Sequence, residues 1–130
     1  MSNPSRDHRA ARNQASITLA DTGASASSIK LYDAQGGTLL AVRRLAKPCG
    51  TINPAGRISL LAAASNDMVL QTGEPTYAEW CDGNDARIES FTVSAENGSG
   101  AIKIIGTLDP ASAMIYANGL LLLDAPILLG

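Results

Sequence analysis

The chain has 130 residues, a length that suits one domain with a core of its own and leaves little room for a second. Apolar residues make up 45% of it, which is typical of globular proteins, whereas charged residues reach only 17%, below the usual quarter. The net charge of −2 excludes a generally basic nucleic-acid binder, and the sparse charge favours a surface that a partner partly covers.

Residues 5–22 are expected to form a helix. Ser5 can accept hydrogen bonds from the free amides of the first turn, and Gly23 supplies the left-handed conformation that ends many helices. The apolar positions recur at spacing four, at Ala11, Ala15 and Leu19. Because this face is small, we expect residues 1–23 to form a helical arm that docks outside the main domain and contacts a neighbouring subunit.

From residue 24 onward the pattern changes to short apolar or alternating segments separated by turns. The expected strands span 29–33, 38–45, 57–63, 68–72, 76–81, 87–95, 101–106, 114–116 and 120–128. Stretches rich in Gly, Ser, Asn and Asp mark turns at 36–37, 65–67, 82–85 and 96–100. The segment 47–56 holds two prolines and two glycines and is expected to be a loop.

This spacing of strands and turns, with no helices between the strands, predicts a mainly β fold. We expect an antiparallel β-sandwich, jelly-roll-like in character, over residues 24–130, together with one N-terminal α-helix. Trp80 lies in an alternating strand and is the largest side chain available, so we expect it to anchor the core on a central strand.

The residue sets that catalysis or metal binding require are missing from the sequence. His8 is the only histidine and lies beside three arginines, which argues against a Ser-His-Asp triad. A zinc site needs about four ligands that the chain does not offer at suitable spacing, and residues 82–85 match a calcium loop in composition only. We therefore expect no enzyme, no cofactor and no small-molecule substrate.

Cysteines and apolar runs indicate the compartment. Cys49 and Cys81 are too few for a secreted disulfide scaffold, so we expect free thiols in a reducing cytosol. The start of the chain lacks the apolar run of a leader, and the longest apolar stretch is far shorter than the ~20 residues of a membrane span. Neither secretion by a leader nor membrane anchoring is expected.

Two groups of residues are candidates for contacts between subunits. Three arginines recur at spacing three along one helix stripe, at Arg6, Arg9 and Arg12. An acidic patch on a neighbouring protein suits them better than nucleic acid, because aromatic partners for bases are lacking. Residues 120–129 hold six leucines and one isoleucine, so a strand there is expected to be buried on both faces. Leu121 and Leu123 are the interface candidates in it, and burial in the monomer core is the alternative.

Several segments, taken in order, match a known pattern. A short helix at 9–15 is followed by the strand Ile29–Asp33 (IKLYD) and by Gly37–Ala41 (GTLLA). Later come Ala78–Trp80 (AEW) and Gly98–Ile102 (GSGAI). In this order they resemble a group of small virion proteins of tailed bacteriophages, and the pieces cover most of the chain.

The sequence also departs from that group at two places. Cys81–Asn84 follows the tryptophan where the group continues its strand, and the C-terminal leucine run replaces a strand rich in Ser and Thr. The resemblance implies a structural component of a phage particle, encoded among tail and virion genes, with no catalytic residue.

We therefore expect a virion structural protein of the tail tip, baseplate or fibre attachment region, assembled in the host cytoplasm. Its partners would be copies of itself and other virion proteins, with no membrane and no nucleic acid among them. A head decoration or minor capsid protein is the first alternative, because such proteins also tend to be small β-rich modules. A carbohydrate-binding module is the second, although one Trp, three Tyr and one Phe provide few aromatic platforms.

Overall fold

A computed structural model describes residues 3–65, 67–107 and 109–130. The described chain is mainly β with one N-terminal helix, as the sequence predicts. The elements are α1 (Arg6–Ala20), β1 (Ser28–Tyr32), β2 (Leu39–Ile52), β3 (Ile58–Ala62), β4 (Asp67–Met68), β5 (Tyr77–Cys81), β6 (Arg87–Ala95), β7 (Ile102–Ile104), β8 (Leu120–Leu121) and β9 (Leu128–Leu129).

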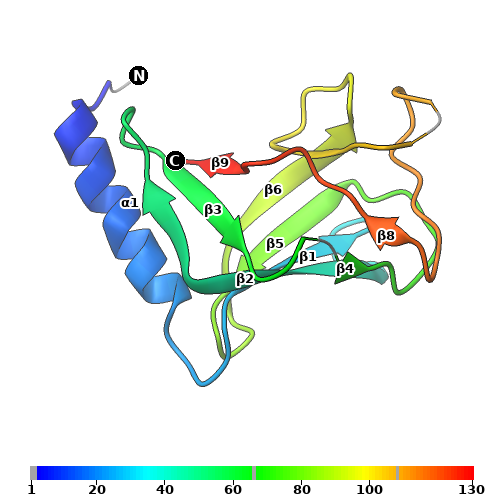
Figure 1. Ribbon diagram of the computed structural model, residues 1–130, viewed down its shortest axis with the longest axis horizontal. Coiled ribbons are helices and arrows are strands. Elements are labelled where there is room, and N and C mark those ends of the chain that lie inside the picture. Colours follow the sequence, from blue (N-terminus) through cyan, green and yellow to red (C-terminus); the bar gives the residue numbers. More distant parts are fainter. Residues whose placement is uncertain (1–2, 66, 108) are drawn as a thin grey trace.

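Seven strands form one curled, mixed sheet in the order β7-β6-β5-β1-β2-β3-β9 (Figure 1). The C-terminal segment joins its two edges, because Leu123 forms a bridge with Ile104 of β7 and β9 then pairs with β3. Neighbouring strands are antiparallel except β6 and β7, which run parallel. The predicted fully antiparallel sandwich is therefore not what the pairing gives.

The parallel pair follows from the way in which the segment 96–101 folds back. The amide of Gly100 donates to Ser94 Oγ at 2.9 Å, and the amide of Ala101 donates to Thr92 Oγ1 at 3.2 Å. A Cβ on Gly100 would lie 2.6 Å from the Ser94 nitrogen, so this close return requires glycine. The predicted turn at 96–100 is present, but it returns the chain alongside β6 in the same direction.

The small strands β4 and β8 form a separate two-stranded ribbon against the main sheet. The amides of Leu70 and Gln71, just after β4, both donate to the carbonyl of Leu40 in β2. Of the predicted turn at 65–67, Asn66 lies outside the described residues and Asp67 already belongs to β4. The predicted strand 68–72 is thus shorter and begins earlier.

The segment 47–56, predicted to be a loop, is largely strand. Strand β2 continues to Ile52, and only residues 53–56 turn, held by Asn53 Oδ1, which accepts from the amides of Ala55 and Arg57. The pairing with β3 shifts between Leu45 and Gly50, and Pro48, which has no amide hydrogen, falls within this irregularity. Proline and glycine here mark a bulge in a long strand and do not end it.

Helix α1 begins where predicted, with Ser5 Oγ accepting from the amide of His8 at 3.2 Å. Its buried face is different from the predicted one. The residues that face β2 and β3 are Asn13, Ile17 and Ala20. Ala11, Ala15 and Leu19 are exposed, so the helix docks on its own domain through the opposite side.

Trp80 lies buried in β5, near the middle of the sheet order, which confirms its predicted role as a core anchor. Its indole Nε1 donates to Ser27 Oγ at 2.8 Å, and that hydroxyl donates to the carbonyl of Cys81 at 2.6 Å. Both cysteines are buried free thiols, as expected. The turns at 36–37 and 82–85 also form as predicted; in the second, Asp82 Oδ1 accepts from the amides of Asn84 and Ala86.

Candidate interaction surface

The outer side of the β4–β8 ribbon carries exposed apolar side chains. Met68 and Leu120 are directly opposite each other in this antiparallel pair, so their side chains lie on the same face. The flanking residues Val69 and Leu121 point to the other face and are buried. The side of the ribbon with Leu121, which also carries Asp67 opposite it, meets the core, whereas the apolar side with Met68 and Leu120 is exposed.

The same alternation extends beyond the ribbon. Gly73 and Ile115 form an antiparallel bridge, and Ile115 is buried, which leaves Tyr116 facing outward. The amide of Ala117 donates to Thr72 Oγ1 at 2.9 Å, which holds this turn beside the chain that follows β4.

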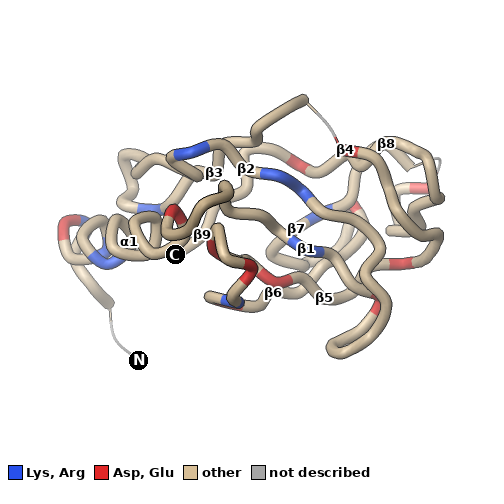
Figure 2. The backbone as a smooth tube through the Cα atoms, turned by 90° about the horizontal axis from the view of Figure 1, so that it is seen from below, with Lys and Arg blue, Asp and Glu red and all other residues tan. Residues whose placement is uncertain are grey.

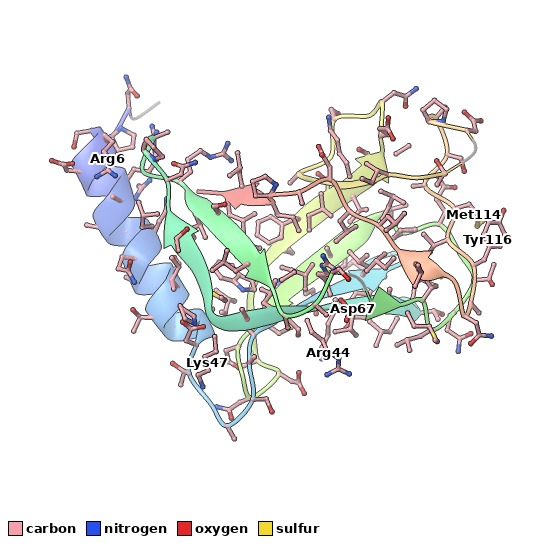
Figure 3. All side chains as sticks on the ribbon, in the orientation of Figure 1. Arg6, Arg44, Lys47, Asp67, Met114 and Tyr116 are labelled. Carbon is pink, nitrogen blue, oxygen red and sulfur yellow. The ribbon has the colours of Figure 1, made fainter. Side chains whose placement is uncertain are left out.

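Five residues make up what we call the ribbon face. Their exposed fractions are Met68 58%, Leu70 52%, Tyr116 64%, Leu120 60% and Leu122 39%. Large apolar side chains gathered in this way mark interaction sites far more often than isolated exposed leucines do. Figure 3 shows Tyr116 and Met114 at the end of the molecule farthest from Arg6 on α1.

A pocket of about 430 Å³ opens beside the ribbon face. Its apolar lining includes Met114, Tyr116, Leu120 and Leu122. The hydroxyl of Thr107, also in the lining, is already engaged with the carbonyls of Asp109 and Ser112, at 2.7 and 3.1 Å. Two further polar side chains of the lining are also engaged, since Ser112 Oγ accepts from the amide of Met114 and Asp109 Oδ1 accepts from that of Ala111. The pocket therefore suits an apolar side chain of a partner better than a polar ligand.

Charge near the ribbon face is mainly acidic, although Arg44 of β2, whose amide donates to Asp67 of β4, is exposed as well. The sequence contains no lysine or arginine at 68–86 or 104–130, whereas Glu74 and Asp109 lie in these segments and are exposed. In Figure 2 acidic positions mark the chain around β4 and β8, while α1 carries both signs. A partner surface that combines apolar and basic groups would complement this end of the molecule.

The arginine stripe predicted for subunit contacts serves mainly the chain itself. Arg6 donates from Nε to the carbonyl of Pro54 and from a terminal nitrogen to that of Asn53, both at 3.2 Å. Arg9 donates to the carbonyl of Ala55 at 3.0 Å. These bonds fasten the start of α1 to the turn between β2 and β3, and Arg12 remains exposed beyond them.

The predicted interface leucines also lie elsewhere than expected. Leu121 and Leu123 are buried in the monomer core, so the core alternative fits them and the interface prediction does not. Residues 120–129 do not form one strand buried on both faces, because exposed Leu120, Leu122 and Leu128 alternate with buried neighbours. The sequence singled out the correct segment but the wrong side of it.

One ion pair of the described residues is largely buried. Arg43 and Asp67 form a largely buried ion pair at 3.4 Å, and Asp67 also accepts from the backbone amide of Arg44. Among the described residues, no three His, Cys, Asp or Glu side chains are grouped closely enough to hold a metal ion. Within the same residues, no helix is long and apolar enough to cross a membrane.

The thiols are protected by burial. Burial raises the pKa of Cys49 from 9.0 to about 12, and the Asp21 carboxylate adds to the rise. Burial likewise raises the pKa of Cys81. A thiol with a raised pKa carries little of the nucleophilic thiolate at neutral pH, which argues against a catalytic role for either residue.

Comparison with models of protein families, with curated proteins and with solved structures gives no match to this chain.

Proposed function

We propose that this protein is a structural subunit that acts through protein–protein contacts made by its ribbon face. The observation that carries the proposal is the group of five exposed apolar side chains on the outer side of β4 and β8 and in the segments beside them. Burying apolar surface of this kind stabilises association by roughly 25 cal/mol per Å² before the costs of ordering are subtracted.

We further propose that the assembly is a tailed-phage virion, in its tail tip, baseplate or fibre attachment region. This step is supported by the order of segments that resembles small phage virion proteins and by the β-rich module with an N-terminal helix. We include in the same proposal that the curled sheet, whose two edges are joined by the C-terminal segment, is a sandwich-like fold.

The test uses cells that carry the genome encoding this chain and release phage particles. Particles are purified on a density gradient, and the chain is quantified in them by mass spectrometry, for the wild type and for two variants. Leu120→Asp places a charge on the ribbon face, and Leu61→Asp places the same charge on an exposed leucine of β3 outside it.

The expected result is that the wild type and Leu61→Asp sediment with the particles, whereas Leu120→Asp is at least tenfold depleted from them. A wild-type chain found only among soluble proteins would overturn the virion proposal. Equal incorporation of both variants would overturn the role of the ribbon face.

A further inference from the structure

We infer that the ribbon face of one copy binds the exposed side of helix α1 of a second copy, so that the protein associates head to tail. This inference rests on the proposed structural role of the ribbon face and names its partner as this same chain. It is carried by the complementarity of two surfaces that the structure leaves uncovered at opposite ends of the molecule.

The first surface is the ribbon face with its acidic surroundings. The segments that carry its five apolar side chains also hold the exposed carboxylates Glu74 and Asp109 and contain no lysine or arginine; Arg44 of β2, beside Asp67, is the exposed basic residue next to β4. Two ribbon faces brought together would therefore set carboxylate against carboxylate, which disfavours a symmetric contact. An apolar surface carrying positive charge fits it better.

The second surface is the side of α1 that faces away from the sheet. Ala11, Ala15 and Leu19 recur there at spacing four, all exposed, and Arg12 precedes Ala15 and Leu19 by three and seven residues. Arg6, which is still half exposed, and Arg9 are engaged in internal hydrogen bonds, whereas Arg12 is an exposed cation beside the stripe of Ala11, Ala15 and Leu19. The exposed carboxylate of Asp7 lies one turn before Ala11. The small alanines allow a close approach, and the arginine can reach a carboxylate.

The positions of the two surfaces determine the form of the assembly. Helix α1 lies at one end of the molecule, and β4 and β8 lie at the other (Figure 1). A contact between unlike surfaces is heterologous, so each copy keeps one free helix and one free ribbon face for further copies. Such a contact produces a ring when the rotation between copies closes and a filament when it does not.

The experiment mixes two complementary variants and follows them by sedimentation velocity. The ribbon variant is Leu120→Asp, and the helix variant is Arg12→Glu combined with Leu19→Asp; all three positions are exposed. Circular dichroism and urea unfolding verify that both fold, and Leu61→Asp serves as the control for an added surface charge.

In head-to-tail association the wild type and the control form oligomers that grow with concentration, while each variant alone is a monomer. An equimolar mixture then forms a one-to-one dimer and nothing larger, because only one intact helix and one intact ribbon face remain to pair. A mixture that stays monomeric overturns the inference, and so does a helix variant that associates as well as the wild type.

Failure of this inference is distinguishable from failure of the proposed function. A wild type that is monomeric at every concentration, yet enters particles only with Leu120 intact, overturns the head-to-tail contact and leaves the structural role to another virion protein. Loss of the particle association itself overturns the proposed function, whatever the purified chain does in solution.

Discussion

At the scale of single residues, Trp80 and Ser27 link two segments of the core, β5 and the chain that enters β1. The indole donates to the serine hydroxyl, which in turn donates to the carbonyl of Cys81, so each buried polar group has a partner. The large side chain fills the middle of the sheet, and the hydrogen bonds fix the chain that enters β1 against β5. Trp80 therefore contributes both apolar packing and a satisfied buried hydrogen bond to the core.

We expect Trp80→Ala to lower the free energy of unfolding by about 3–5 kcal/mol, because it opens a large cavity in the core. Ser27→Ala is expected to cost about 1–3 kcal/mol, since it leaves the buried indole nitrogen without its acceptor. Urea unfolding followed by circular dichroism measures both. A loss below about 1 kcal/mol for Trp80→Ala would show that the side chain is exposed in solution.

Cys49 predicts a decline of stability in alkali. Its thiol pKa rises from 9.0 to about 12 on folding, so above pH 9 the unfolded chain releases a proton that the folded protein retains. The resulting stabilisation is complete below the unfolded pKa and is lost as the pH rises toward the folded pKa.

The free energy of unfolding should thus fall between pH 9 and 12 more steeply for the wild type than for Cys49→Ala, which lacks the titrating group. Urea unfolding across that range compares the two slopes. Identical slopes would mean that the thiol titrates alike in both states.

At the scale of elements, helix α1 belongs to the folded domain. Ile17 and Ala20 are buried against the sheet, and the Asn13 side chain donates to the carbonyl of Gly56 at 2.8 Å. Just after the helix, Asp21 Oδ1 accepts from the amide of Cys49 at 3.0 Å. The element predicted to dock outside the main domain and contact a neighbouring subunit thus packs against its own sheet.

Two substitutions in α1 distinguish its faces. Ile17→Ala should destabilise the protein by about 2–5 kcal/mol through a cavity between helix and sheet. Leu19→Ala, on the exposed face, should change the free energy of unfolding by no more than about 0.5 kcal/mol. Thermal or urea unfolding gives both values, and the reverse order would place the predicted alanine face against the sheet.

The sequence predicts best those features that depend on interactions between residues close together in the chain. The cap at Ser5 and the turn after Asp82 depend on neighbouring residues only, and both were predictable. The continuation of β2 through Pro48 depends on pairing with β3 and packing under α1, which lie far away in sequence. Local composition indicated a loop there because proline and glycine serve bulges as well as loops.

The leucine run sets a similar limit on the candidate site. Along residues 120–123 exposed and buried side chains alternate, but every residue is leucine, so polarity does not mark the outer face. The exposed side becomes identifiable only through the pairing of Leu120 with Met68. Composition therefore identified residues 120–129 as a candidate segment but could not show which of the leucines are exposed.

At the scale of the whole molecule, the uncovered surfaces are unequal. One end carries the ribbon face and its pocket, and the other carries the small-residue side of α1 with Arg12 (Figures 1 and 3). A sparsely charged chain with an apolar end is expected to associate. The proposed structural role requires that the ribbon face becomes covered when the protein assembles.

Hydroxyl-radical footprinting tests that claim most directly, because methionine and tyrosine side chains react readily when exposed. Met68 and Tyr116, both more than half exposed in the monomer, are compared between dilute protein and assembled oligomers or particles, with Leu61 as the reference outside the ribbon face. We expect severalfold slower modification of Met68 and Tyr116 on assembly and an unchanged rate at Leu61. Modification rates at Met68 and Tyr116 that do not change between dilute protein and assemblies would contradict this expectation.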